Sequence, residues 1–527
     1  MHQEDSVREP QSSVEPDGAA SRPTRAESSN PSGPRAVLAI ALPLIASTAS
    51  MTVMNFVDRM FLLWHSPLEM AAAMPAGLLY FTLLCFPLGL ASYVNTFVAQ
   101  YHGAGRPDRI GAAVWQGVRL GLYCTPLFLL AIPLAPAAFD FAGHDEAVRP
   151  LETLYLQILC ISSGAVIMGA ALSAFYTGRG QTGVVMIVDI VANGVNIVLD
   201  YAWIFGLWGF PEWGIAGAAW ATTFSQWLKV GIFLALMSSS SHRREYHFER
   251  GRQIDWTVIR RLFRYGGPNG LQMLVEMGAI TLFIFLVGRL GRDELTATNL
   301  AFNVNSVAFL PMLGMGLAVS TIVGQQLGRN RDDLAARATY TALWLTAIYA
   351  SPLVIAYVAT PDLFLFPHAV GTSEVDFEPL RETTIVLLRF VAVFCLFDML
   401  AIIFSSAIKG AGDTFFVLVV NLILPPLWLA LGFVGVRYFG GGLIWCWIVI
   451  TIWVVVGGLV FMLRFWQGGW RSMRVIEPDL LTTDDKLPGG ADIDVDRDRS
   501  GPRAIEGTGE LGDEPAAPRP VGDPAVA

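Results

Sequence analysis

The sequence predicts an all-α polytopic membrane protein with 12 transmembrane helices, arranged as two six-helix lobes related by a parallel repeat. Over 527 residues the chain is 54% hydrophobic and only 15% charged, whereas a soluble protein carries about 25% charged residues. Apolar runs long enough for a membrane-spanning helix recur along most of the chain. Short motifs also repeat in the same order in its two halves. These three observations define the predicted fold class.

The apolar runs define the predicted spans. About 20 residues in an α-helix, at about 1.5 Å of rise each, cross a hydrocarbon core of about 30 Å. Twelve runs meet this requirement, at 36–63, 70–100, 110–139, 150–176, 183–207, 214–238, 262–288, 295–326, 334–360, 383–408, 414–436 and 442–464.

The two halves of the chain resemble each other. PLIASTAS at 43–50 matches PNGLQMLV at 268–275, an offset of 225 residues, and the same offset carries 98–108 onto 323–333. GRGQT at 178–182 meets GAGDT at 410–414 at an offset of 232. Such duplication is typical of transporters that rock one lobe against the other around a central site. The match of 98–108 with 323–333 aligns Gln100 with Gln325, Gly103 with Gly328 and Arg106 with Arg331.

Both ends of the chain differ from its apolar body. Residues 1–34 hold 6 acids and 3 bases, and residues 475–527 hold 13 acids and 5 bases. Their abundance of Pro, Gly, Ser and charge predicts disorder, because too little apolar surface is available for burial. Of the net charge of -9, these tails contribute -3 and -8, which leaves the body at +2. The predicted domains are a disordered cytoplasmic N-terminal tail (1–34), an N-terminal lobe (35–240), a cytoplasmic linker (241–258), a C-terminal lobe (259–474) and a disordered acidic cytoplasmic tail (475–527).

Basic residues concentrate on one set of connections between the spans. Cytoplasmic connections carry the excess of Lys and Arg in membrane proteins. We therefore expect both termini to be cytoplasmic, in a multi-pass protein of the bacterial inner (plasma) membrane. The basic residues on these connections include Arg106, Arg109, Arg179, Arg243, Arg244, Arg252, Arg260, Arg261, Arg329, Arg331, Arg337, Lys409, Arg471 and Arg474.

Two acids of the second half lie inside apolar segments. Glu276 is near the middle of the run between Arg264 and Arg289, and Asp398 is near the middle of the run that ends at Lys409. A carboxylate at that depth costs at least about 2.5 kcal/mol, so an intramembrane acid is a functional candidate. Two buried carboxylates repel each other unless a proton or a cation lies between them. A protonated acid that only bonds a neighbouring helix is the alternative interpretation.

The first half carries a polar stripe on its fifth span. Asp189, Asn193, Asn196 and Asp200 are spaced i, i+4, i+7 and i+11, which places them on one helical face. Their oxygens suit a hard monovalent cation or a proton. The stripe could also face a water-filled vestibule without binding anything, especially at Asp189, close to the cytoplasmic end. From periodicity alone, Asp58 is either an intramembrane acid or a residue at a helix end.

Motifs of soluble enzymes are absent from the sequence. It holds no Walker loop, GxSxG elbow, HExxH or CxxC motif, so neither direct ATP hydrolysis nor metal catalysis is expected, nor any cofactor. The five cysteines lie inside apolar runs and are interpreted as packing residues. No nucleotide or nucleic-acid partner is expected.

Four segments resemble the multidrug and toxic compound extrusion (MATE) transporters, NorM/DinF-like, over about 36–470. They are VAQYHGAG at 98–105, FVD at 56–58, NIVLDY at 196–201 and GIAGAAWAT at 214–222. The resemblance implies a cation-coupling site in each lobe, with Na⁺ or H⁺ as the coupling ion, and a monomer. The implied residues are Asp58, Asn196, Asp200 and Thr222 in the N-terminal lobe and Glu276 and Asp398 in the C-terminal lobe.

One position departs from the pattern of the resemblance. NorM-like members often have a tyrosine one turn before the tenth-helix aspartate, and this chain has Phe394. The loss of that oxygen weakens the case for sodium coordination in the C-terminal lobe and leaves proton coupling unaffected.

Together these observations predict a secondary active antiporter that exports amphipathic, often cationic organic compounds in exchange for Na⁺ or H⁺, with substrate bound between the lobes. One alternative is a flippase for lipid-linked oligosaccharides or peptidoglycan precursors, which needs a cationic central cavity, whereas Arg is scarce within the spans. A membrane-embedded acyl- or glycosyltransferase and a passive channel are the alternatives from other classes. The lipid bilayer and small organic substrates are the expected partners.

Overall fold

The computed structural model describes residues 32–142, 145–238, 242, 245–246, 248–369 and 374–477. All of these residues belong to one unit. Of the predicted tails at 1–34 and 475–527, residues 1–31 and 478–527 lie outside the described residues.

The first half of the chain folds into a lobe of long helices. Several of them begin at a proline, whose fixed φ and missing N–H suit the first helical turn. Tyr93 separates two helices within the second predicted span. The elements are α1 (Pro34–His65), α2 (Pro67–Ser92), α3 (Val94–Gly103), α4 (Pro107–Ala131), η1 (Ile132–Leu134), α5 (Ala135–Ala142), α6 (Arg149–Thr177), α7 (Thr182–Ile204) and α8 (Ile215–Met237).

The second half repeats this architecture after a short connection. Asp255 caps its first long helix by accepting hydrogen bonds from the backbone N–H groups of Thr257 (3.0 Å) and Val258 (3.1 Å). The elements are α10 (Phe248–Gly251), α11 (Trp256–Gly288), α12 (Arg292–Gly328), α13 (Asp332–Ala359), α14 (Pro361–Ala369), α15 (Glu374–Ala411), α16 (Thr414–Tyr438), α17 (Leu443–Trp466) and η2 (Gly469–Ser472).

The described residues confirm a polytopic all-α fold. They contain 11 helices that are long and apolar enough to cross a membrane. The helix α8 is also 23 residues long, but Gln226 and Lys229 make it more polar. Each of the twelve predicted spans coincides with one of these helices or with consecutive helices. Large apolar side chains such as Leu130 and Ile355 are exposed on the helices, as expected for surfaces that face lipid.

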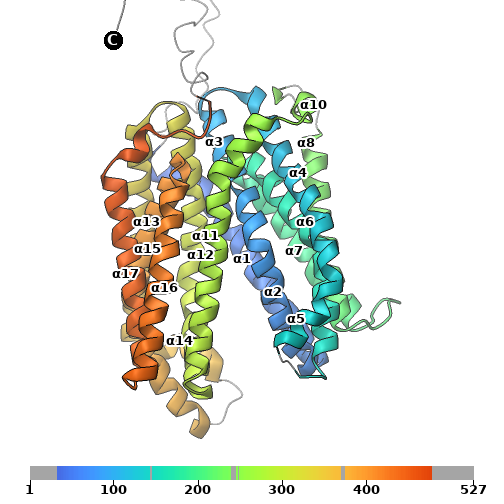
Figure 1. Ribbon diagram of the computed structural model, residues 1–527, viewed down its shortest axis with the longest axis vertical. Helices are drawn as coiled ribbons and strands as arrows, with labels where there is room; N and C mark the ends of the chain where they lie inside the picture. Colours follow the sequence, from blue (N-terminus) through green and yellow to red (C-terminus); the bar gives the residue numbers. More distant parts are fainter. Residues whose placement is uncertain are drawn as a thin grey trace, which may run out of the picture. The chain divides into compact units, whose positions relative to one another are not determined.

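The two lobes lie side by side in Figure 1, with α1–α8 forming one and α11–α17 the other. They contact each other through α1 with α12, α2 with α11, and α3 with α12. In the figure the lobes converge at the end where α3 and α10 lie and diverge toward α5 and α14. Within the C-terminal lobe, the core centres on the fully buried Trp447.

The residues that repeat in sequence meet in space where the lobes converge. The amide nitrogen of Gln100 donates to the carbonyl oxygen of Gly410 (3.0 Å), and that of Gln325 donates to the carbonyl oxygen of Gly178 (2.8 Å). A side chain on Gly103 would overlap the backbone of Gln325, and one on Gly328 would overlap the backbone of Gln100. These reciprocal contacts relate the lobes as the sequence repeat predicts, because each motif crosses its own counterpart.

The packed body extends past the predicted boundary at 475. Val475 and Ile476 are 0% and 1% exposed and belong to an apolar cluster with residues of α2, α3 and α11. Val475 and Ile476, which the composition assigns to the C-terminal tail, therefore pack against the body, because they find a buried apolar surface that the local composition does not reveal. The sequence also places Lys409 in a connection after the tenth span, whereas it lies in the last turn of α15.

Candidate ion-coupling sites in the two lobes

The first candidate site lies in the N-terminal lobe between α1, α7 and α8. Asp58 lies seven residues before the end of α1, so it is inside the helix and not at its end. Asp200 of α7 is fully buried. The two carboxyl groups are close enough to interact electrostatically, and both interact with the buried Tyr155 of α6. Among the described residues, one oxygen of each carboxyl group is buried without a hydrogen-bond partner.

Asn196 holds this site together. In the amide orientation that satisfies both neighbours, its nitrogen donates to Asp200 Oδ2 (3.1 Å), and its oxygen accepts from the backbone N–H of Thr222 (3.1 Å). Asn196 is 0% exposed, which makes it a rigid support for the carboxyl group. The four residues Asp58, Asn196, Asp200 and Thr222 thus come from three helices, and their oxygen atoms suit a proton or a hard cation.

The other two residues of the predicted stripe make different contacts. Asp189 accepts a hydrogen bond from the Ser47 hydroxyl of α1 and forms an ion pair with Lys229 of α8, with 2.5 Å between Oδ1 and Nζ. Asn193 donates to the Ser50 hydroxyl (3.0 Å). The stripe therefore faces protein, and Asp189 already has a cationic partner, which separates it from the acids at Asp58 and Asp200.

The second candidate site lies in the C-terminal lobe between α11 and α15. Glu276 and Asp398 are half-buried and close enough to interact electrostatically. The amide nitrogen of Gln272 donates to Glu276 Oε1 at 2.8 Å, and the amide oxygen of Gln272 is buried with no hydrogen-bond partner within the described residues. The amide oxygen of Gln272 could accept a hydrogen bond from a protonated carboxyl group or coordinate a sodium ion.

Glu276 also lies near the boundary between the lobes. It interacts electrostatically with Lys409 of α15 and with the thiol of Cys85 on α2, a helix of the other lobe. The backbone oxygen of Lys409 accepts a hydrogen bond from the Tyr93 hydroxyl of the N-terminal lobe (2.8 Å). The surroundings of Glu276 therefore include residues of both lobes.

Phe394, at the position where NorM-like members often have a tyrosine, packs within the C-terminal lobe. Phe394 is buried and stacks on Trp447 with 6.3 Å between ring centroids. Trp447 in turn donates its indole N–H to the Thr298 hydroxyl (3.2 Å). The side chain at this position packs in the core of the lobe, one turn from Asp398.

The structure brings the predicted residues together within each lobe but not across the lobes. Over the described ranges, no hydrogen bond or ion pair joins Asp58 or Asp200 to Glu276 or Asp398. No group of three or more His, Cys, Asp and Glu side chains arranged for a metal ion was found among the described residues. Any bound sodium ion would therefore depend on amide and hydroxyl oxygens as well as carboxylates.

Sequence reasoning missed Lys229, Gln272 and Tyr155. Lys229 could have been found, because a lysine inside an apolar segment is a functional candidate in the same way as an acid. The spacing of Gln272, four residues before Glu276, also places both on one helical face. Tyr155 carries no such signal, since its interaction with Asp58 and Asp200 depends on how α6 is placed in the lobe.

Comparison with known proteins identifies the family. The model of the MatE family matches residues 43–202 and 268–434, one segment in each lobe. The chain belongs to the MatE family. The two segments of MatE begin 225 residues apart (268 minus 43), which equals the offset of the repeat found in the sequence. Membership of this transporter family excludes the transferase alternative.

Several curated relatives of this MatE protein are similar over most of its length. A probable multidrug resistance protein NorM of Thermotoga maritima is 23% identical over 445 residues, covering 84% of this chain and 94% of that protein. A probable NorM of Bradyrhizobium diazoefficiens is 29% identical, covering 81% and 92%. The multidrug resistance protein NorM of Vibrio cholerae is 25% identical, covering 72% and 82%.

Solved structures share the fold of this MatE protein. One, described as the outward-facing conformation of a multidrug resistance MATE family transporter of the MOP superfamily, superposes with a TM-score of 0.77 at 18% identity, covering 85% of this chain and 98% of that one. A MOP superfamily transporter from Pyrococcus furiosus, whose binding pocket is described as having reverse polarity, superposes with a TM-score of 0.76 at 19% identity, covering 84% and 98%.

Proposed function

We propose that this protein is a secondary active antiporter that exports amphipathic, often cationic organic compounds in exchange for Na⁺ or H⁺. The observation that carries the proposal is a pair of interacting acids in each of two repeated lobes. Neither pair is neutralised by an ion pair with Lys or Arg among the described residues. Relatives at 23–29% identity are named as multidrug resistance proteins.

Coupling follows from the electrostatics of the acid pairs. Two carboxylates in a low-dielectric interior repel each other, so a bound proton or cation lowers the free energy of the pair. Glu276 lies at the lobe boundary, and binding there would favour one arrangement of the lobes over the other. A ligand shifts such an equilibrium only by its difference in affinity between the two states. Cation and organic substrate would then favour opposite arrangements.

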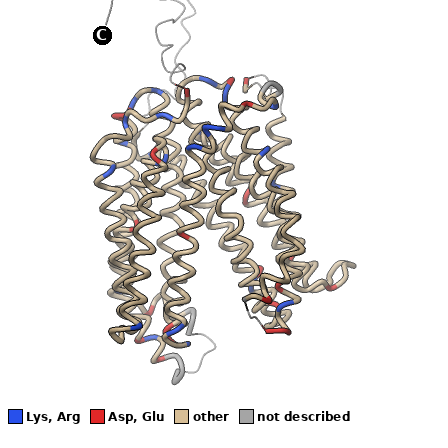
Figure 2. Tube along the Cα trace, viewed as in Figure 1, with Lys and Arg blue, Asp and Glu red and all other residues tan. Residues whose placement is uncertain are grey.

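We infer that the end of the molecule bearing α3, α10 and η2 faces the cytoplasm. Figure 2 supports this orientation, because Lys and Arg residues gather along the chain at that end and are fewer at the opposite end. Both termini would then be cytoplasmic, in a bacterial plasma membrane. The predicted lobes (35–240 and 259–474), the linker (241–258) and a monomeric state belong to the same proposal.

The flippase alternative requires a cationic surface between the lobes. Lys229 and Lys409 lie inside membrane helices, but Lys229 pairs with Asp189 and Lys409 interacts with Glu276. Because Lys409 makes no ion pair with either acid of that site among the described residues, carboxylates remain the dominant charges at the candidate sites and favour the export of cations.

The proposal is tested by efflux of a cationic fluorescent dye from cells that express the protein, with the Na⁺ gradient and the pH gradient varied independently. We expect gradient-dependent efflux, and we expect it to fall about tenfold or more in Glu276→Gln with Asp398→Asn, because a lost coupling term is typically worth about 1–3 kcal/mol. Asp58→Asn with Asp200→Asn tests the other lobe.

A matched control removes an acid outside both sites. Asp108 pairs with Arg106 (3.0 Å) at the surface, and Asp108→Asn is expected to leave efflux unchanged. Full gradient-dependent efflux by both double variants would remove the acid pairs from the mechanism. The gradient that is required for efflux, of Na⁺ or of H⁺, identifies the coupling ion.

A further inference from the structure

We propose that Val475–Glu477, the segment that follows η2, is a strap that fastens the two lobes together where they converge and sets how readily this end of the molecule opens. The proposal rests on the alternating movement of the lobes within the proposed function. It concerns a different part of the molecule, far from the acid pairs in sequence and contact.

The backbone of the strap is held on both sides. The N–H of Val475 donates to Gln100 Oε1 of the N-terminal lobe (2.8 Å), and its carbonyl oxygen accepts from Arg261 Nη1 of α11 (2.9 Å). Gln100 also donates through its amide nitrogen to the backbone of α15. One fully buried amide side chain therefore joins α3, α15 and the strap.

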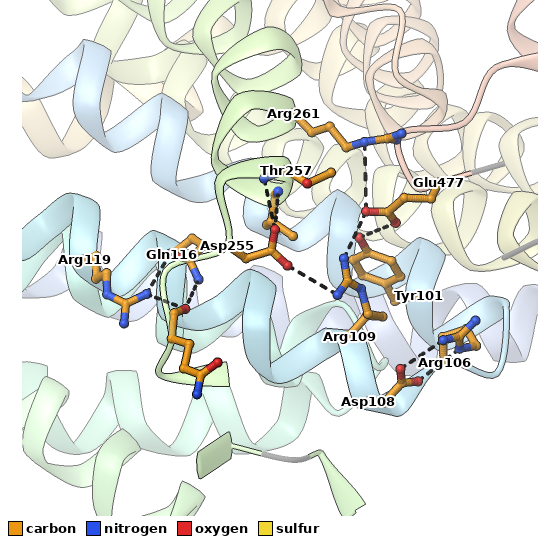
Figure 3. A network of polar contacts seen from close by, with 12 residues as sticks. Tyr101, Arg106, Asp108, Arg109, Gln116, Arg119, Asp255, Thr257, Arg261 and Glu477 are labelled. Carbon is orange, nitrogen blue, oxygen red and sulfur yellow. Dashed lines mark hydrogen bonds and ion pairs between the residues drawn. The ribbon is translucent and has the colours of Figure 1, made fainter. Parts of the chain in front are cut away.

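Glu477 extends this attachment with charge, as Figure 3 shows. It accepts a hydrogen bond from the Tyr101 hydroxyl (2.8 Å), and it forms ion pairs with Arg109 (3.2 Å) and Arg261 (4.0 Å). Arg109 and Tyr101 belong to the N-terminal lobe, whereas Arg261 belongs to α11. The Glu477 side chain is only 16% exposed, so these interactions are screened less than those of a surface pair.

Apolar burial adds to the polar contacts. Val475 and Ile476 are 0% and 1% exposed, in a cluster that includes Phe97 of α3 and Leu262 of α11. A Cβ atom on Gly412, which has φ of +116°, would lie 2.9 Å from a Val475 methyl carbon. The end of α15 thus passes against the strap so closely that a glycine is required there.

Of the two repeated glutamines at the interface, Gln100 and Gln325, only Gln100 is bonded to the strap. Gln100 and Gln325 make equivalent bonds to the opposite lobe through their amide nitrogens. The amide oxygen of Gln100 also binds Val475, a residue beyond the last repeated helix. Separation of α3 from α11 must break the strap's bonds to at least one lobe, because Val475 and Glu477 each bond to Arg261 of α11 and to the N-terminal lobe.

The experiment measures opening of this end without substrate or ion. Asn95 is 4% exposed and donates to the Thr321 hydroxyl of the other lobe (3.0 Å), so Asn95→Cys is a buried reporter. It is placed in a chain whose five native cysteines are replaced by serine, and the purified protein in detergent is reacted with a maleimide. The rate of labelling then reports how often the lobes part.

Two truncations form a matched pair. A chain that ends at Glu477 keeps the strap, and a chain that ends at Arg474 lacks it. We expect the first to label at the rate of the intact chain and the second about tenfold faster, since hydrogen bonds to charged groups and buried apolar contacts are lost together. Glu477→Gln, which keeps the backbone and the apolar side chains, is expected to label a few-fold faster.

A control and three outcomes decide the proposal. Asp108→Asn breaks an ion pair within the N-terminal lobe at the same end and is expected to leave labelling unchanged. Equal labelling of both truncations would overturn the proposal. So would an equal increase in the control, which would indicate general loosening. If the chain ending at Arg474 does not fold, Glu477→Gln decides, and an unchanged rate there overturns the strap. Efflux plays no part in this readout, so failure of the strap and failure of the antiporter are distinguishable.

Discussion

Removal of the lysine inside α8 tests the electrostatics of the N-terminal lobe. Lys229→Met keeps most of the side-chain volume but takes away the cation that lies 2.5 Å from Asp189 Oδ1. The two side chains are 24% and 11% exposed, so water replaces the lost partner only in part. Asp189 retains the hydroxyl of Ser47. The variant therefore leaves a carboxylate with one neutral hydrogen-bond donor.

The size of the effect is bounded from two directions. At 2.5 Å and an effective dielectric constant of about 20, the attraction between the two charges is about 6–7 kcal/mol. Desolvation offsets part of it, and breaking a buried pair by removing one partner costs about 3–5 kcal/mol. We expect a destabilisation of about 3 kcal/mol at pH 7.

Unfolding in mixed micelles of a mild detergent and SDS, followed by tryptophan fluorescence, measures the free energy of unfolding of Lys229→Met and of the unsubstituted chain at pH 7.

Two further variants complete the test. Lys229→Arg keeps a cation and should cost less than the methionine variant. Adding Asp189→Asn to Lys229→Met removes the isolated charge and should recover most of the loss, as expected for two residues that interact directly. A double variant as unstable as Lys229→Met would refute the assignment of this ion pair.

Two other predictions concern close packing. Gly103→Ala introduces a methyl group that overlaps the backbone of Gln325; we expect the lobes to part there and maleimide labelling of a buried reporter cysteine to rise, and an unchanged rate would contradict the crossing. Phe394→Ala removes the ring that stacks on Trp447 and should destabilise the protein by about 3–4 kcal/mol in the same SDS assay, whereas Phe394→Leu should cost less; a loss below about 1 kcal/mol would show that this core is not tightly packed.

The sequence alone was sufficient for the spans and their duplication. A membrane-spanning helix satisfies its backbone hydrogen bonds within one segment, so an apolar run such as 262–288 is enough to predict α11. Proline at the first turn of α1 and α4 also marks where helices begin. The acids inside apolar runs were predicted for the same reason, because their position deep within an apolar segment can be seen from that segment alone.

Only the tertiary structure decided which polar groups meet. Periodicity placed Asp189 and Asp200 on one face of α7, but it could not show that the first pairs with Lys229 and the second lies near Asp58. It also could not show that Glu477, in a segment predicted to be a tail, joins both lobes. Helix rotation and packing fix these partners, and neither is encoded within a single segment. The polar side chains of each helix can be identified within its own segment, whereas their interaction partners depend on the neighbouring helices.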